Sequence, residues 1–266
     1  MPIPLRYLGL ALLLAPSFSL ANEVACDRES LVPEHRLTLF GELHGTNETP
    51  VVVAEHVCQL STKRPVVLVL EIPRSEQAAI DRYLSSDGRR ASRKQLIESA
   101  FWAADWQDGR ASIAMLDLID RIRELNAKGA KITVVADDGF SGQDRDLVMS
   151  ETVAANMRKS PDAAVVGLFG NYHTGEIIGT RSNPDHQRIG YRLRSFDPLT
   201  VTVEPARGWA WLCAPKCGIS SAGFMKAAPT SPSFRFVQSE RNGHDAVLIL
   251  PRATPAPPAK LIADEG

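Results

Sequence analysis

The sequence has no excess of charge of either sign, few aromatic residues and no long hydrophobic run. Its 266 residues include 30 Lys and Arg against 31 Asp and Glu, and only 6% are aromatic. The balanced charge disfavours the basic footprint of a nucleic-acid-binding protein, so we expect no nucleic-acid partner. A composition that is 44% hydrophobic and 23% charged also excludes a disordered, collagen-like or coiled-coil chain. The sequence therefore indicates a globular protein of enzyme size.

Several common functional signatures are also absent. The sequence has no Gly-x-Ser-x-Gly, which disfavours the common serine hydrolases with an α/β fold. It has no His-Glu-x-x-His, no Walker sequence and no dinucleotide-binding glycine pattern, which argues against that class of zinc protease and against nucleotide binding. It also has no Cys-x-x-Cys-His, the attachment site of covalent haem. Any catalytic chemistry must therefore use another arrangement of residues.

The N-terminus has the pattern of a secretory signal peptide. Arg6 precedes a short apolar run, Leu8 to Leu14, and the segment ends in Ser19-Leu20-Ala21. We therefore expect residues 1–21 to be removed and the mature protein to be periplasmic or extracellular. The run is shorter than the ~20 residues that a membrane span requires, so no stable span is expected after removal. An uncleaved N-terminal anchor is the alternative.

All four cysteines lie in the predicted mature chain, where an oxidising compartment favours disulfides. Cys213 and Cys217 are close enough in sequence for a local bridge, and Cys26 and Cys58 would then tie the N-terminal arm to the first helix. A zinc knuckle is the alternative, but one Cys-x3-Cys pair is weak evidence for it. The sequence thus favours two structural disulfides.

Apolar segments of strand length alternate with helical segments, which predicts an α/β fold with a mainly parallel central sheet flanked by helices. The predicted strands of this part are 36–41, 65–70, 131–136 and 163–169, and helices are expected near 49–58, over most of 75–127 and over 144–159. Three further strand-like segments, 199–203, 233–237 and 245–250, have no long helix between them and predict an antiparallel C-terminal extension. Residues 22–250 are expected to form a single domain, and the proline-rich residues 251–266 a flexible tail.

Polar side chains follow the ends of four predicted strands. Ligands of open parallel sheets bind beyond these carboxyl ends. Polar residues are common at such turns in any fold. This alone does not explain why two imidazoles and several carboxylates would lie together at one edge, or rim, of the sheet. These residues are Glu42, His44 and Glu48; Glu71 and Arg74; Asp137 and Asp138; Asn171 and His173.

Two Gly-x-x-His segments are the most specific sequence pattern at this rim. They are Gly41-Glu-Leu-His44 and Gly170-Asn-Tyr-His173, and in each the glycine is expected to let the chain turn tightly at the end of a strand. Two imidazoles from separate strands can converge on one atom, as a metal pair or as a base and its electrostatic partner. The spacing alone is weak evidence, but its recurrence at two equivalent places strengthens it.

Residues 41–48, Gly-Glu-Leu-His-Gly-Thr-Asn-Glu, resemble the first signature of the erythromycin esterase/ChaN/Tiki superfamily. Arg145, Asp146 and Met149 resemble a helix of the esterase branch, and Gly170 to His173 resemble the second histidine motif. The likeness covers roughly residues 36–176. It implies one cleft that holds both histidines, with ester or peptide hydrolysis in some branches. It also implies a divalent metal in the Tiki branch and haem binding in the ChaN branch.

On this resemblance, His44 is the candidate general base or metal ligand, and Glu42 or Glu71 would orient it or share the metal. His173 would be a second base or ligand, or would stabilise negative charge. Arg145 would stabilise an oxyanion, although a salt bridge with Asp146 at the start of a helix explains it equally well.

Further candidates carry less weight. Glu48 and Asp138 are secondary, and His186 is of interest because its loop also carries Asp185 and Arg188. The remaining histidines, His35, His56 and His244, are scattered and are expected at the surface or in packing.

The leading functional hypothesis is an exported hydrolase of an ester or amide, acting on a small molecule or a peptide. In this hypothesis His44, His173, Glu42, Glu71 and Arg145 are catalytic, with or without a divalent metal held by the two histidines and the two glutamates. The alternative is a non-enzymatic protein that binds or takes up haem or metal through the same histidines. A third hypothesis is a relative with only a structural role. The sequence leaves the substrate and the oligomeric state open.

Overall fold

The computed structural model describes residues 24–138, 144–180, 183–213, 215–237 and 243–263. The predicted signal peptide, residues 1–21, lies outside the described residues. None of the helices in the described ranges is both long and apolar enough to span a membrane.

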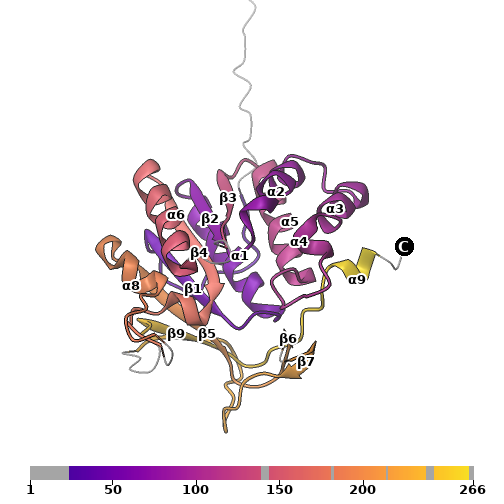
Figure 1. Ribbon diagram of the computed structural model, residues 1–266. Coiled ribbons are helices and arrows are strands. Elements are labelled where there is room, and N and C mark those ends of the chain that lie inside the picture. Colours follow the sequence, from indigo (N-terminus) through magenta and orange to yellow (C-terminus); the bar gives the residue numbers. More distant parts are fainter. Residues whose placement is uncertain (1–23, 139–143, 181–182, 214, 238–242, 264–266) are drawn as a thin grey trace, which may run out of the picture.

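A seven-stranded sheet forms the centre of the protein, in the order β3-β2-β4-β1-β5-β9-β8 (Figure 1). Its first six strands in this order are parallel, and only β8 runs antiparallel to its neighbour β9. A separate antiparallel pair is formed by β6 and β7. The strands are β1 Leu37–Glu42, β2 Val66–Leu70, β3 Ile132–Ala136, β4 Ala164–Gly170, β5 Leu199–Pro205, β6 Trp209–Cys213, β7 Cys217–Ser221, β8 Ser233–Phe236 and β9 Ala246–Leu250. The predicted fold class, a mainly parallel α/β sheet, is confirmed.

Helices cover both faces of the sheet (Figure 1). Phe40, Leu68 and Leu70 pack against the side of α1 and α5, whereas Leu39 and Val69 pack against the side of α6 and α8. Because both faces are buried, the inner strands are almost continuously apolar. The helical segments are α1 Glu48–Ser61, η1 Arg74–Glu76, α2 Gln77–Leu84, α3 Arg90–Ile97, α4 Ala100–Ala103, α5 Ile113–Ala127, α6 Arg145–Lys159, α7 Asn171–Thr174, α8 Ile189–Leu193, η2 Arg194–Phe196 and α9 Lys260–Ala263.

The C-terminal extension is less antiparallel than the sequence suggested. β5 pairs with β1, and β9 pairs with β5, both in parallel. Antiparallel pairing is confined to β8 on β9 and to the β6–β7 hairpin. A parallel connection needs a dozen or more residues but not necessarily a helix, and residues 206–245 between β5 and β9 provide that length.

Residues 251–259, which the sequence suggested as part of a flexible tail, pack against the rest of the protein. Ala253, Ala256 and Ala259 are buried there, and residues 253, 255 and 258 make single β-bridges with other parts of the chain. Figure 1 shows this segment running along the domain to α9. Prolines hold the segment extended, and small side chains let it lie close to its neighbours, so a composition that resembles a loose tail here forms a packed strap.

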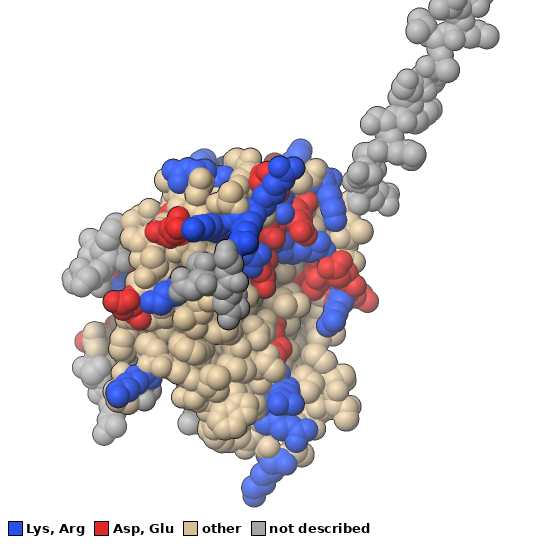
Figure 2. Space-filling model, turned by 90° about the vertical axis from the view of Figure 1, so that its right-hand side faces the viewer, with Lys and Arg blue, Asp and Glu red and all other residues tan. Residues whose placement is uncertain are grey.

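Charged side chains of both signs are interspersed on the face that carries α3 and α4 (Figure 2). Among the ion pairs of α3 are Arg93 with Asp117 and Lys94 with Glu98. Neither sign forms a continuous patch on this face, in keeping with the formal net charge of −1.

Two disulfides are present, with the pairing that the sequence favours. Cys26–Cys58 ties the N-terminal arm to α1 across a sequence separation of 32 residues. Cys213–Cys217 closes the tip of the β6–β7 hairpin across a separation of 4 residues. The longer loop restricts the unfolded chain more, so the first bridge is expected to contribute more to global stability.

We therefore expect the double variant Cys26→Ala/Cys58→Ala to lower the free energy of unfolding by about 3–4 kcal/mol. The matched variant Cys213→Ala/Cys217→Ala should lose about 2 kcal/mol, because its loop is short. Urea denaturation of both variants measures the difference. Equal losses would show that loop length does not govern the contribution of these bridges.

Candidate functional site

The carboxyl ends of β1, β2 and β4 bring the two predicted histidines to one carboxylate. His44 Nε2 lies 3.6 Å from Glu71 Oε2, and His173 Nε2 lies 3.9 Å from Glu71 Oε1. Glu71 directly follows β2, His44 follows β1 by two residues, and His173 lies in α7 immediately after β4. Because these strands are parallel neighbours, their ends meet at the same edge of the sheet. The predicted convergence of His44, His173 and Glu71 is therefore present in the structure.

Each imidazole is held from its other nitrogen by a second carboxylate. His44 Nδ1 lies 2.8 Å from Glu42 Oε1, and His173 Nδ1 lies 2.7 Å from Asp146 Oδ1. Asp146 also contacts His186 Nε2, at 2.5 Å, through its other oxygen. These contacts fix the ring orientations, so that the Nε2 atoms of His44 and His173 both face Glu71.

Glu71 is also the acceptor for cationic groups and for the backbone. Its Oε2 accepts a hydrogen bond from the amide of Gly170 at 2.7 Å. Its Oε1 accepts from Arg145 Nη2 at 2.7 Å and from Arg110 Nη1 at 3.4 Å. Arg110 and Arg145 both form ion pairs with Asp138 as well. Arg145 is thus an ion-pair partner of Glu71 as well as a residue at the start of a helix.

The charges in this cluster shift the pKa values of its members. Burial alone would raise the pKa of Glu71, but the positive charges of His44, His173 and Arg110 outweigh burial and hold it at about 2. Burial would lower the pKa of His44, but the Glu71 charge and the contact with Glu42 outweigh it and raise the pKa to about 9. At neutral pH, Glu71 is therefore a carboxylate and His44 an imidazolium.

The two motif glycines serve close approach rather than a tight turn. Both lie at the ends of strands with ordinary backbone angles, which differs from the reason that the sequence suggested. A Cβ on Gly170 would lie 3.1 Å from His44 Nε2, and one on Gly41 would lie 2.3 Å from Thr174 Oγ1. Larger residues at these positions would displace the groups that surround the histidines.

Arg110 is the main site residue that the sequence did not reveal. It lies in a loop, within a stretch expected to be mainly helical, and it also pairs with Asp108 at 2.8 Å. The intervening Gly109 has φ +98°, and a Cβ there would lie 2.4 Å from the amide nitrogen of Gly45, so the loop passes directly against the first histidine motif. The Asp108-Gly109 dipeptide is a turn signal that could have marked this loop.

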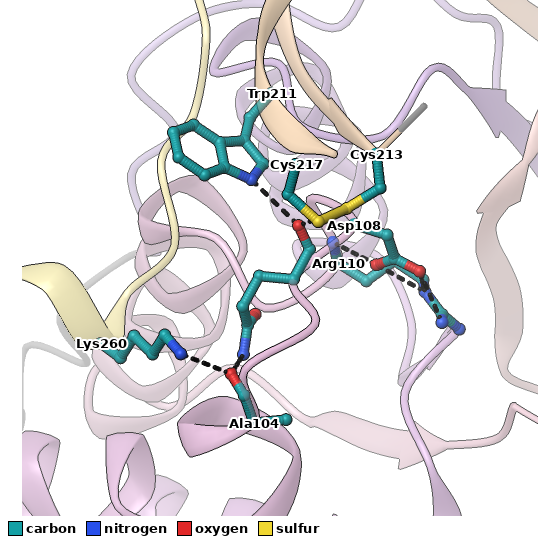
Figure 3. The surroundings of a disulfide bond; sticks show 8 residues. Ala104, Asp108, Arg110, Trp211, Cys213, Cys217 and Lys260 are labelled. Atoms are coloured by element: carbon teal, nitrogen blue, oxygen red, sulfur yellow. Dashed lines mark hydrogen bonds and ion pairs between the residues drawn. A yellow bond between two sulfur atoms is a disulfide. The ribbon is translucent and has the colours of Figure 1, made fainter. Parts of the chain in front are cut away.

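The Cys213–Cys217 hairpin supports the loop that carries Arg110 (Figure 3). Trp211 Nε1 donates a hydrogen bond to the carbonyl oxygen of Gln107 at 2.9 Å. The Gln107 side chain in turn donates to the carbonyl oxygen of Ala104 at 2.8 Å, which also accepts from Lys260 at 2.7 Å. The hairpin and the first residue of α9 therefore hold the loop that carries Arg110.

Of the secondary candidates, Asp138 joins the site and Glu48 does not. Both carboxylate oxygens of Glu48 accept a hydrogen bond from the backbone amide of Thr254 at 3.0 Å, which anchors the C-terminal strap. Glu48 therefore has a structural role in the fold.

The three remaining histidines lie in other surroundings. His35 lies 2.5 Å from the carbonyl oxygen of Asp197, and His56 is buried beside Ser30. His244 is buried, with its Nε2 2.8 Å from the hydroxyl of Thr174. His186, in contrast, shares Asp146 with His173 and so belongs to the site.

The donor set around His44 and His173 does not fit a divalent metal. Two guanidinium groups already pair with Glu71, and a metal ion would have to compete with both. Within the described ranges, Asp144, Asp146 and His186 form the only group of three ligand atoms within 4.8 Å of one another. Their carboxylates already contact Arg192 and His173. The site is therefore built for cationic side chains.

The two histidines are also not placed as haem ligands, because an imidazole that holds haem iron needs a ring nitrogen that faces the haem. Glu42, Glu71 and Asp146 instead contact the two imidazoles directly, and the Glu71 carboxylate lies between their Nε2 atoms.

No protein-family model and no curated protein matches this chain. Three solved structures share its fold. A mutant of erythromycin esterase EreC has a TM-score of 0.62 and 10% identity, with 84% of this chain and 92% of that chain covered. A succinoglycan biosynthesis protein has a TM-score of 0.61 and 9% identity, with 83% and 88% covered. A protein from Bacillus cereus has a TM-score of 0.59 and 11% identity, with 84% and 90% covered. At these identities the similarity shows the fold alone.

The pKa shifts predict how stability depends on pH. The folded pKa of Glu71 lies below its ordinary value of 4.5, so its contribution is complete above pH 4.5 and is lost as the pH falls toward 2. The folded pKa of His44 lies above 6.5, so its contribution is complete below pH 6.5 and is lost as the pH rises through about 9. We expect Glu71→Gln to lower the free energy of unfolding by about 2–4 kcal/mol at pH 6, and by less at pH 9.5, where His44 is neutral.

Urea denaturation at the two pH values measures this effect. The matched control is Glu34→Gln, which removes an exposed partner of Lys63 and should cost less than about 0.5 kcal/mol at either pH. A loss for Glu71→Gln that is the same at both pH values would contradict the coupling to His44.

Proposed function

We propose that this protein hydrolyses an ester or amide by direct attack of water, with His173 as the general base. The observation that carries the proposal is the arrangement of the two imidazoles, each fixed through Nδ1 by its own carboxylate and each presenting Nε2 to the same charged cluster. A pair of oriented imidazoles beside guanidinium groups supplies both a proton acceptor and stabilisation of negative charge.

His173 is suited to accept the proton of the attacking water. Asp146 holds its Nδ1 at 2.7 Å, which stabilises the imidazolium that forms on protonation, as the aspartate of a catalytic triad does. Its Nε2 has no hydrogen-bond partner among the described residues, and Glu71 at 3.9 Å is too far to accept one. This nitrogen is therefore available to a water molecule.

His44 has the complementary role, which differs from the general base suggested by the sequence. Since Glu71 and Glu42 keep it protonated at neutral pH, it cannot accept a proton there, but it can stabilise a developing oxyanion. Arg145 pairs with the same Glu71 carboxylate that His44 faces. It is half-exposed and contributes further positive charge to the site. Stabilisation by such groups is typically worth ~3–4 kcal/mol per well-placed donor.

The proton balance of the reaction is complete without a covalent intermediate. The water oxygen forms a bond to the carbonyl carbon while His173 takes a proton. The carbonyl oxygen becomes the oxyanion that His44 stabilises. On collapse the bond to the leaving group breaks, and His173 returns the proton to it. Among the described residues no serine, threonine or cysteine side chain is hydrogen-bonded to His44 or His173, which supports water as the nucleophile.

Kinetics of single variants on 4-nitrophenyl esters and on a peptide panel test these roles. We expect His173→Asn to lower kcat about 10²–10⁴-fold, because a general base typically contributes that much. His44→Asn should lower kcat about 10²–10³-fold through the loss of oxyanion stabilisation. His35→Asn, which changes a histidine bonded to the carbonyl oxygen of Asp197, is the matched control and should leave kcat unchanged.

Treatment with EDTA should also leave the activity unchanged, because the site is occupied by cationic side chains. Full activity in His173→Asn would overturn the assignment of the base. Loss of activity in EDTA that added zinc restores would show that a metal takes part.

We also propose that the protein is exported. The predicted signal peptide and two disulfides within one chain support this, since disulfides persist in oxidising compartments. Expression of the full chain with N-terminal sequencing of the mature protein should give a start at Asn22. A start at Met1 in a membrane fraction would instead indicate an uncleaved anchor.

A further inference from the structure

Arg188 is a buried cation with no anionic partner among the described residues. Its side chain lies at the start of α8 with 8% relative exposure, and its Nε is buried with no hydrogen-bond partner. In the parts of the chain that the structure describes, no carboxylate lies within ion-pair distance of it. Its terminal nitrogens are not completely buried and so reach the solvent.

This position is costly, because a guanidinium that is largely removed from water without an ionic partner loses hydration, which stacking on an aromatic ring replaces only in part. The other two arginines of the site show the usual solution, since Arg110 and Arg145 both pair with Glu71 and Asp138. His244, whose pKa is lowered to about 4 by burial and then by the Arg188 charge, stays neutral and supplies no compensation. The negative charge that would balance Arg188 must therefore come from outside the described chain.

The surroundings of Arg188 lead directly to the proposed general base. Its guanidinium carbon lies 4.6 Å from the centre of the Tyr172 ring, which is 45% exposed. The same ring meets His173 edge-on, at 5.4 Å between ring centres, and stacks on His186 at 6.0 Å. One aromatic side chain thus separates the unpaired guanidinium from the imidazole that would activate water.

We propose that Arg188, stacked on Tyr172, binds an anionic group of the substrate, so that the natural substrate is an ester or amide that carries a carboxylate or another oxyanion close to the scissile bond. The inference rests on the proposed hydrolase for the position of the scissile bond. A planar guanidinium binds oxyanions through two parallel hydrogen bonds, and stacking on an aromatic ring holds its plane in place.

Two esters that differ only in the end of the acyl chain test the subsite. Mono-4-nitrophenyl glutarate ends in a carboxylate, whereas 4-nitrophenyl valerate has an uncharged chain of the same length. We expect Arg188→Gln to raise KM for the glutarate ester at least about tenfold, with kcat changed less than about twofold. KM for the valerate ester should not change. Arg188→Lys should recover part of the loss, because it restores the charge without the planar fork.

Arg194→Gln is the matched control. Arg194 also stacks on a tyrosine, Tyr191, at 4.0 Å, but it is exposed, so its loss should change neither KM. Thermal unfolding checks the fold of each variant, and Arg188→Gln should unfold at the same or a higher temperature, since it removes an unpaired buried charge. If Arg188→Gln does not fold, the comparison of the two esters with Arg188→Lys decides.

Binding of glutarate and of inorganic phosphate, measured by calorimetry with wild type and Arg188→Gln, separates this inference from the proposed function. If neither ester is hydrolysed but one of the anions binds only with Arg188 present, the subsite stands and the hydrolase fails. The anion that binds also identifies the group as a carboxylate or a phosphate. If the esters are hydrolysed but Arg188→Gln changes both KM values equally or neither, or if neither anion depends on Arg188, the subsite is overturned.

Discussion

The site is organised around the burial of one negative charge, the carboxylate of Glu71. A buried carboxylate is stable only when cations and donors surround it, and here the His44 imidazolium, two guanidinium groups and the Gly170 amide do so. Each of these groups comes from a different segment of the chain. The ends of β1, β2 and β4, the start of α6 and the loop before α5 are therefore tied to one point, and the shape of the site follows from the requirements of this single charge.

The same charge decides the chemical roles of the two histidines. His44 has Glu71 and Glu42 on either side of its ring, and the Glu71 charge together with the Glu42 contact keeps it protonated by raising its pKa to about 9. His173 has its short contact with Asp146, and the Nε2 atoms of both rings lie beyond hydrogen-bond distance of Glu71, at 3.9 Å for His173 and 3.6 Å for His44. Two rings that look equivalent in the sequence thus differ in the charges around them, and we assign the base to His173 because His44 is kept protonated. Motif spacing cannot contain this information, since it depends on which carboxylates surround each ring.

Patterns in the sequence predicted those parts of the fold and the site that depend on local regularity. The apolar runs gave the parallel strands, and parallel strands necessarily place their terminal residues at one edge, so the meeting of His44, His173 and Glu71 could be predicted. Arg110 could not, because its place depends on how a loop crosses the first histidine motif through Gly109. The packing of residues 251–259 was hidden for a similar reason, since proline and alanine are typical of a loose tail as well as of an extended strap.

An unpaired buried arginine raises the question of why the fold retains it. The similarity to EreC and the Bacillus cereus protein, at 10% and 11% identity, concerns the backbone and does not account for a particular side chain. A guanidinium that served stability alone would be placed beside a carboxylate or in water, as Arg110 and Arg194 are. Preorganised binding sites commonly reduce the stability of the free protein, because the groups that a ligand will satisfy are left unsatisfied without it. Arg188 meets this description and lies one ring away from the proposed base, so its cost in the free protein is best explained by a gain in the complex.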